Sequence, residues 1–274
     1  MKLPNCSNMM RIGQLRHIQS VVETGDRRNP DSLVRYLLSP AQELGCLWRS
    51  RVRLSHLRSD PFYHYVIART KYYDDLFVSA IRNGVKGIVN IGCGSDTRSY
   101  RFLELLREHG VAVAECDQFD AIETKHKAAS RLWPTGHVDY LGADLNTGEW
   151  PDLDRWLGGN KGKPVFVLME GVSPYIATGA FARFLDFLAD RLVCGSSFAY
   201  DFKISGKADT FGRSLNAADP FRLPAVLGTV SRFHEIHGFH VERMEQSDAL
   251  AMRLLPSLSG ENLFTEDCLL ELVR

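Results

Sequence analysis

Residues 89–101 read VNIGCGSDTRSYR, an apolar run that passes through a glycine-containing turn into a segment of helical composition. Gly92 and Gly94 stand where a strand would end and a helix begin, so the backbone can approach a ligand without an intervening side chain. A short Gly-x-Gly also occurs in ordinary tight turns. Its meaning therefore depends on the sequence around it.

Apolar runs bounded by turn residues alternate with segments of helical period, which is typical of a parallel sheet flanked by helices. After a loop rich in Gly, Asp and Pro, a helix is expected to end at Gly238 and a strand to follow, and the tail from Asn262 also has strand character. We predict an α/β fold with a Rossmann-like, seven-stranded, mostly parallel sheet and helices on both faces. The five clearest strand candidates are residues 86–94, 111–117, 138–144, 164–171 and 196–203.

The chain of 274 residues is long enough for one large domain, and we expect residues 1–274 to form a single one. Residues 1–75 are expected to form a helical lid over the strand ends, and residues 76–274 the core. Near the start, Asn29 or Asp31 is a candidate cap for a helix that carries Leu33 and Leu37 on one face.

Composition excludes several classes of partner. Lys plus Arg and Asp plus Glu both number 33, so no overall charge draws the chain to nucleic acid or to an anionic membrane. No stretch approaches the roughly 18–20 apolar residues of a membrane span, and the first residues lack the apolar region of a signal peptide. The six cysteines show no metal-ligand spacing and fit a reducing compartment, so we expect a cytoplasmic protein without a metal; the oligomeric state stays open.

Acidic residues follow the second and third strand candidates. Asp117 comes about 25 residues after Gly92, near the spacing at which nucleotide-binding sheets place a carboxylate under the ribose hydroxyls. Its two oxygens can accept both hydroxyl protons. Asp144 could accept the amino group of an adenine while Leu145 packs against the ring. A solvated loop acid is the alternative interpretation of Asp117.

The residues of this turn also distinguish between two kinds of adenosine-containing cofactor. A dinucleotide fingerprint needs a third glycine for close approach to the pyrophosphate, but Thr97 occupies that position. Asp96 would also repel a phosphate. S-adenosylmethionine carries no phosphate, and its sulfonium and ammonium groups tolerate nearby carboxylates. The charge pattern therefore favours S-adenosylmethionine over a nicotinamide dinucleotide.

Taken together, ordered pieces of the chain resemble the leucine carboxyl methyltransferase family and its bacterial relatives, often grouped as PPM methyltransferases. The resemblance runs from about Asp31 to Tyr200, and the Asp-Thr-Arg after the glycines and the Glu-Gly after the fourth run carry most of it. It implies a class I methyltransferase fold and S-adenosylmethionine as the cofactor. The matching pieces are DSLVRYLL, ARTKYYDDLF, NIGCGSDTRSYR, AECDQFDAIETK, DLNTGEWPDLDRWL and LMEGVSPYI.

The resemblance also implies individual roles. Arg69 would grip the cofactor carboxylate, for which a planar guanidinium suits bidentate pairing. Glu170 would meet the methionine ammonium group, and a carboxylate directly after a buried strand needs such a cationic partner. The family also uses a basic residue near the amino terminus, for which Arg35 is the nearest candidate. The remaining implied contacts are Gly92 for backbone approach, Asp117 for the ribose, and Asp144 with Leu145 for the adenine.

Methyl transfer is an in-line displacement at an activated carbon, so an enzyme mainly aligns the accepting atom and excludes water. A carboxylate acceptor needs no deprotonation at neutral pH, whereas a hydroxyl benefits from a base. Tyr63, His64 and Tyr175 are the catalytic candidates, and Asp201 ends the fifth strand candidate; each has a packing role as its alternative. Aromatic residues such as Phe62 suggest a small apolar substrate.

These observations favour a methyltransferase that uses S-adenosylmethionine to methylate a hydroxyl or carboxyl oxygen of a small molecule, such as a polyketide- or peptide-like secondary metabolite. A protein carboxyl terminus is the nearest alternative acceptor. A non-catalytic module with the same fold and a NAD-binding Rossmann protein are the alternatives from other classes.

Overall fold

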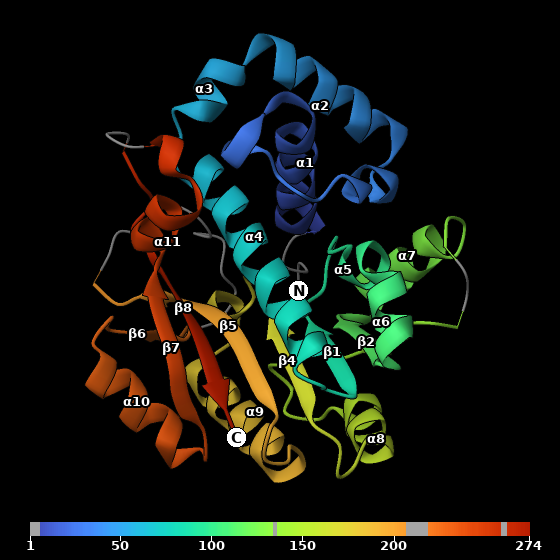
Figure 1. Cartoon of the computed structure of the whole chain (residues 1–274), viewed down its shortest axis with the longest axis vertical. Coiled ribbons are helices and arrows are strands. Elements are labelled where there is room, and N and C mark those ends of the chain that lie inside the picture. Colours follow the sequence, from blue (N-terminus) through green and yellow to red (C-terminus); the bar gives the residue numbers. More distant parts are fainter. Residues whose placement is uncertain (1–5, 134–135, 207–218, 259–261) are drawn as a thin grey trace.

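The computed structural model describes residues 6–133, 136–206, 219–258 and 262–274. Its centre is one sheet in which seven strands follow the order β3-β2-β1-β4-β5-β8-β7, and the two-residue strand β6 pairs with β5 outside this path (Figure 1). The predicted α/β class and the mostly parallel seven-strand path are confirmed. The short β6 makes the sheet eight-stranded, one more than predicted.

The first five strands run parallel, and each lies within a predicted apolar run, except that β5 extends one residue beyond its run, to Ile204. In the centre, Gly87 of β1 pairs with Ala112 of β2 on one side and with Val165 of β4 on the other. β1 and β4 are buried along their whole length, as expected of strands covered on both faces. The five strands are β1 (Gly87–Ile91), β2 (Ala112–Asp117), β3 (Asp139–Gly142), β4 (Val165–Met169) and β5 (Ser197–Ile204).

The C-terminal part closes one edge of the sheet with antiparallel pairing. β8 (Asp267–Val273) lies between β5 and β7 (His240–Gln246) and runs antiparallel to both. The expected helix end at Gly238, the strand after it and the strand in the tail are confirmed, with a φ of +78° at Gly238. β6 spans Arg222–Leu223; most of the expected loop before it lies outside the described residues.

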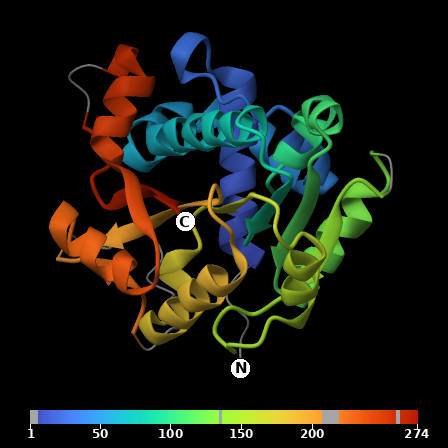
Figure 2. The same ribbon diagram turned by 60° about the horizontal axis from the view of Figure 1, so that its bottom comes forward.

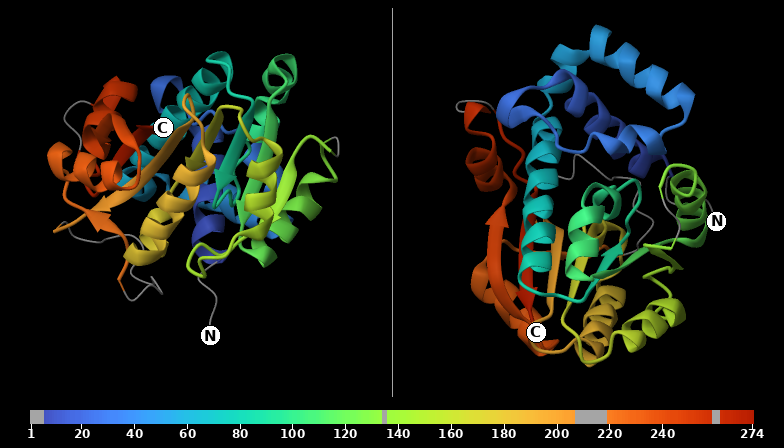
Figure 3. Two further views of the ribbon diagram at one scale, coloured as in Figure 1. Left: turned by 90° about the horizontal axis from the view of Figure 1, so that it is seen from below. Right: turned by 45° about the vertical axis from the view of Figure 1, so that its right-hand side comes forward.

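Helices cover the sheet on two faces, and each face has its own hydrophobic core (Figure 3). Ile88 and Phe166 of adjacent strands point into one core, and Val89 and Val167 into the other, as the alternation of a strand requires. The first core holds side chains of α4 (Pro61–Arg82), α5 (Arg98–Arg101), α6 (Leu103–His109), α7 (Phe119–Ala129) and α11 (Ser247–Leu254). The second holds those of α8 (Pro151–Gly159), α9 (Thr178–Arg191) and α10 (Leu227–Ile236).

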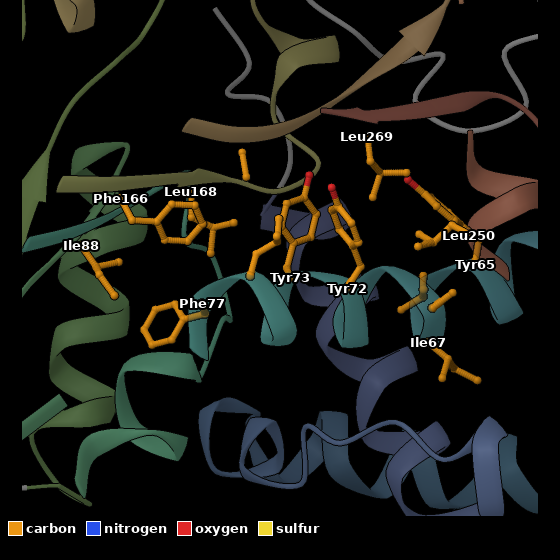
Figure 4. Close-up of a cluster of buried hydrophobic side chains, with 14 of the residues drawn as sticks. Tyr65, Ile67, Tyr72, Tyr73, Phe77, Ile88, Phe166, Leu168, Leu250 and Leu269 are labelled. Atoms are coloured by element: carbon orange, nitrogen blue, oxygen red, sulfur yellow. The ribbon is translucent and has the colours of Figure 1, made fainter. Parts of the chain in front are cut away.

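α4 is the longest helix among the described residues and lies across the sheet (Figure 4). Asp60 starts it by accepting a hydrogen bond from the Phe62 amide at 3.0 Å, and Pro61 occupies the first turn, where a missing N–H costs nothing. Tyr73 and Phe77 are fully buried and face Phe166 and Leu168 of β4. This packing fixes the position of every side chain that α4 carries toward the strand ends.

The N-terminal helices gather at one end of the sheet (Figures 1 and 2). The expected lid boundary at residue 75 falls inside the continuous α4, so this layer ends at α3. Leu33–Leu37 forms a five-residue 3₁₀ helix rather than an α-helix, with Asp31 accepting from the Val34 amide at 3.1 Å. Ser39 and Gln42 form a reciprocal cap at the start of the next α-helix. The layer contains α1 (Cys6–Val22), η1 (Gly25–Arg27), η2 (Leu33–Leu37), α2 (Pro40–Val52) and α3 (Leu54–Arg58).

None of the helices within the described residues combines the length and apolar character needed to cross a membrane. The cysteines whose side chains the structure describes are free thiols.

Three-residue 3₁₀ turns follow β4 at Ser173–Tyr175 (η3) and α11 at Pro256–Leu258 (η4).

The packing of α4 on β4 gives a stability prediction. Phe77→Ala should lower the free energy of unfolding by about 3–5 kcal/mol, because it removes a fully buried ring that stacks on Phe102 at a centroid distance of 5.6 Å. Ile236→Ala, at a side chain that is 75% exposed, should change it by less than about 0.5 kcal/mol. Urea unfolding followed by circular dichroism measures both, and equal effects of the two substitutions would refute the packing described.

Candidate functional site

A cavity of about 450 Å³ lies at the carboxyl ends of the parallel strands. The loop after β1, the residues that follow β2, β3 and β4, and the last part of β5 line it, with α1 and α4 contributing from the side of the N-terminal helices. Ligand sites of open α/β sheets occur at this edge, and this volume falls within the range of about 300–1,000 Å³ found for small-molecule pockets. We therefore treat it as the candidate site.

The turn after β1 forms the floor of the cavity. Gly92 and Gly94 adopt φ values of +63° and +44°, which residues with a side chain rarely tolerate. A Cβ at Gly92 would also lie 2.2 Å from a methyl group of Val172, so a side chain there has no room. Both glycines line the cavity, as expected from the Gly-x-Gly pattern.

Asp117 closes the turn from the end of β2. Its carboxylate accepts hydrogen bonds from the amides of Gly94 and Gln118, both at 2.8 Å. Burial raises the pKa of Asp117 and outweighs the opposite effect of these two amide donors. Each oxygen keeps a lone pair that can accept a ligand hydroxyl. Asp117 thus lines the cavity with spare acceptor capacity, at the place predicted for a ribose contact.

The end of β3 brings Asp144 and Leu145 to the same cavity. Asp144 accepts from the Asn146 amide at 2.9 Å, which forms a local turn, and Leu145 is buried at 7% exposure. The 65% exposed ring of Phe119 lines this end as well, and a Cβ at Gly142 would lie 2.2 Å from it. Sequence reasoning missed Phe119, although its place two residues after Asp117 could have indicated it.

Glu170 follows β4 and faces two guanidinium groups. Arg69 of α4 donates to one carboxylate oxygen at 3.0 Å, and Arg98 of α5 donates to the other at 2.9 Å. Burial alone would raise the pKa of Glu170, but Arg98 and Arg69 reverse the direction and lower it. The protein itself thus supplies two cationic partners for Glu170, and a contact with a cofactor amine stays a prediction.

Arg98 explains the Asp-Thr-Arg segment after the glycines. It is fully buried and pairs with Asp74 of α4 at 2.7 Å, with Glu170 and with Asp96 two residues earlier. It also donates to the carbonyl oxygen of Thr70 at 3.1 Å. Asp96 is thus committed to an internal ion pair, which binds the turn to α4 and to the end of β4.

Arg69 and Asp201 form the wall on the side of β5. Arg69 is 5% exposed and pairs with Asp201 at 3.1 Å in addition to Glu170. Asp201 also accepts from the amide of Gly171 at 2.6 Å. All four of these residues line the cavity. Arg69 and Glu170, the two residues expected at the methionine end of the cofactor, are thus in direct contact with each other.

The basic residue that α1 contributes is Arg16, and sequence reasoning missed it. Arg35, the candidate considered, lies in η2 and donates to the Tyr36 hydroxyl at 2.9 Å outside the cavity. Arg16 lines the cavity, pairs with Asp31 at 3.1 Å, and has a buried Nε with no hydrogen-bond partner among the described residues. Its spacing of four from Ile12, which also lines the cavity, is the signal that marks this face of α1.

Two of the three catalytic candidates lie elsewhere. The Tyr63 hydroxyl donates to Glu23 at 2.9 Å, and His64 Nε2 contacts the carbonyl oxygen of Arg58 at 2.9 Å. Neither residue lines the cavity, whereas Tyr175 does. The reason is helical period: Phe62 lies seven residues before Arg69 and shares its face of α4, while Tyr63 and His64 turn away toward the N-terminal helices.

No group of three or more His, Cys, Asp or Glu side chains with metal-binding geometry occurs among the residues that the structure describes. The cavity instead combines carboxylates at or near the carboxyl ends of β2, β3, β4 and β5 with Arg16 and Arg69. Such a site can bind an organic cation with hydroxyl groups, and its apolar side chains can pack against a ring.

The buried ion network predicts a large stability effect at Arg98. Arg98→Met should lower the free energy of unfolding by about 3–5 kcal/mol, because it leaves carboxylates of three other residues buried beside an apolar chain. Arg155→Met, which breaks an exposed pair with Asp152, should cost less than about 1 kcal/mol. Denaturant titrations of both variants test this; a loss at Arg98 as small as that at Arg155 would contradict the network.

Comparison with known proteins agrees with this geometry. The model of the leucine carboxyl methyltransferase family matches residues 18–189. A Mycobacterium tuberculosis protein whose name describes an S-adenosyl-L-methionine-dependent methyltransferase is 31% identical over 179 residues, which cover 65% of this chain and 54% of that protein. A similarly named protein of Mycolicibacterium smegmatis is 35% identical over 136 residues, which cover 49% of this chain and 43% of that protein. The chain thus spans about half the length of these curated relatives.

Among solved structures, a crystal structure described as a methyltransferase from Thermobifida fusca superposes with a TM-score of 0.57. The alignment covers 90% of this chain and 94% of that one at 12% sequence identity, which supports a common fold. The fold is that of a class I methyltransferase, and the cofactor that goes with this fold and family is S-adenosylmethionine. Because the family match extends over more than half of the sequence, the chain belongs to the leucine carboxyl methyltransferase family.

Proposed function

We propose that this chain transfers a methyl group from S-adenosylmethionine to a hydroxyl or carboxyl oxygen of a small molecule. Family membership and fold support methyl transfer. The observation that carries the proposal is the position of Asp117, Asp144 and Glu170, which follow three different strands and line one cavity. Such a ring of carboxylates suits a sulfonium nucleoside and repels a diphosphate.

The residues present fit this cofactor. Asp117 would accept the ribose hydroxyls and Asp144 the adenine amino group, while Leu145 packs on the ring. Glu170 is held in its anionic form by two arginines and would attract the methionine ammonium group. When bound, the cofactor supplies an activated methyl group, so the chain's own task is to align an oxygen with that methyl and to keep water out.

Two cationic side chains are placed for the methionine carboxylate. Arg69 would take it, as the family resemblance implies, although both Glu170 and Asp201 already share its guanidinium. Arg16 supports the same task from α1 through its unused Nε donor. A Cβ at Gly13 would lie 2.6 Å from Ser95 Oγ, so the glycine lets α1 approach the turn after β1 closely enough for Arg16 to reach the cavity.

A small acceptor is favoured by the size and walls of the cavity. Its volume of about 450 Å³ has to hold the cofactor as well, and Phe62, Tyr175 and α1 bound the remainder. The apolar walls fit a secondary metabolite of polyketide or peptide type. A protein carboxyl terminus is the runner-up acceptor, because the family takes its name from that reaction.

The cofactor assignment predicts the effect of Asp117→Ala. S-adenosylhomocysteine should bind about tenfold more weakly or worse, since one buried charged acceptor is lost, and the thermal unfolding midpoint without ligand should fall only slightly. Asp186→Ala, remote from the cavity and 60% exposed at its side chain, serves as the matched control with unchanged affinity. Isothermal titration calorimetry measures both; equal affinity of Asp117→Ala and the unaltered chain would remove Asp117 from the site.

A further inference from the structure

Beyond Glu170 the cavity continues to the ends of β5 and β8. We call this region the acceptor end; its lining residues are Phe62, Asp201, Phe202, Lys203 and Asp267. It adjoins the place proposed for the methionine amine, because Arg69 bridges Glu170 and Asp201. In the methionine chain only two methylene groups separate the amine-bearing carbon from the sulfur. The sulfur and its methyl group would therefore lie close to the acceptor end.

The cations at the acceptor end are already matched by carboxylates. Lys203 is 5% exposed, and its ammonium group lies 2.8 Å from Asp267 and 3.2 Å from Glu266. The guanidinium of Arg69 is shared by Glu170 and Asp201. Within the described residues that form this wall, each positive charge thus has two acidic partners.

Charge at the acceptor end is consequently negative. Arg69 offsets Glu170, and Lys203 offsets only one of the two carboxylates of Asp201 and Asp267. A carboxylate substrate would enter a buried region in which anions outnumber cations, which is unfavourable in a poorly solvated site. A hydroxyl group carries no charge and donates a hydrogen bond, so the same carboxylates would hold it. The electrostatics therefore discriminate between the two acceptors that the proposed function leaves open.

We propose that the methyl acceptor is a hydroxyl group on an apolar skeleton and that Asp201 accepts its proton, an inference that rests on the proposed O-methyl transfer. The hydroxyl oxygen attacks the methyl carbon with a lone pair. The carbon–sulfur bond breaks, and its electron pair stays on sulfur as the neutral thioether. The proton leaves the oxygen for the carboxylate of Asp201, and the product is a methyl ether.

The geometry of Asp201 suits this task. It is 2% exposed, and one oxygen accepts from the Gly171 amide at 2.6 Å while the other accepts from Arg69 at 3.1 Å. These contacts fix the carboxylate and leave a second lone pair on each oxygen. Phe62 and Phe202 line the cavity beside it and provide apolar surface for the rest of the acceptor.

Titration of Asp201 supports the same role. The pKa of Asp201 is raised to about 6; burial is the largest cause, Arg69 and the Gly171 amide oppose it, and Asp267 and Glu170 add to it. Asp201 is therefore ionised above about pH 6 and protonated below it, so kcat/KM should fall as the pH decreases through this value. The titratable and charged groups whose interactions with Asp201 are resolved are Arg69, Tyr65 and Tyr73 of α4, Glu170 after β4, Tyr200 of β5 and Asp267 of β8.

The first test identifies the bond that is made. The full chain is incubated with methyl-labelled S-adenosylmethionine and a metabolite extract of its native organism, and the labelled products are treated with mild alkali. A methyl ether keeps its label, as we expect, whereas a methyl ester releases labelled methanol. Release of methanol would overturn the hydroxyl assignment and leave O-methyl transfer intact. Absence of label from every oxygen, with S-adenosylhomocysteine still bound, would overturn the proposed function itself.

The second test addresses Asp201 with the labelled product as readout. Asp201→Asn should lower kcat about 100-fold or more and abolish the fall in rate near pH 6, while affinity for S-adenosylhomocysteine changes by less than about tenfold. Asp186→Asn, the same substitution at a remote exposed site, should leave the rate and pH profile unchanged. A loss in Asp201→Asn that saturating cofactor restores, or an unchanged acid limb, would reduce Asp201 to a structural role and refute the proposal.

Discussion

The carboxylate of Glu170, held between the guanidinium groups of Arg69 and Arg98, is the constraint on which the site depends. A buried carboxylate without a cationic partner would take up a proton. A buried arginine without an anionic partner would likewise carry a large desolvation cost. Their pairing keeps the charge at the end of β4. Because the partners come from α4 and from the start of α5, the same contacts fix these elements relative to the sheet.

This constraint makes the cavity electrostatically uneven. At the nucleoside side, Asp117 and Asp144 offer carboxylate oxygens at the ends of β2 and β3. At the other side, Lys203 and Arg69 are neutralised within the protein. An organic cation is therefore favoured in the first part, and an uncharged hydrogen-bond donor in the second. Both preferences arise because acidic residues from several strands gather at one edge of the sheet: Asp117, Asp144 and Glu170 lie at or just after the ends of β2, β3 and β4, Asp201 lies in β5, and Asp267 begins β8.

Sequence patterns predict the sheet and its acidic edge because the signals for both lie in short stretches of sequence. Apolar runs ending in Asp117 or Glu170 show where strands stop, and parallel strands bring their ends together. Placement of Arg16 depends on how α1 docks, a long-range contact that no local pattern encodes. Tyr63 and His64 were misplaced because the sequence shows that α4 is a helix but not which face of it meets the cavity.

Arg98 illustrates a second limit. The Asp-Thr-Arg motif that contains it is unusual in the sequence, yet its partners Asp74 and Glu170 lie 24 and 72 residues away, so the ion network is visible only in three dimensions.

The central claim, that these carboxylates surround a sulfonium nucleoside, is tested most directly by a crystal structure with S-adenosylhomocysteine. The account predicts the ribose at Asp117 and the amine at Glu170. A nucleoside bound outside this cavity, or with its amine remote from Glu170, would contradict it.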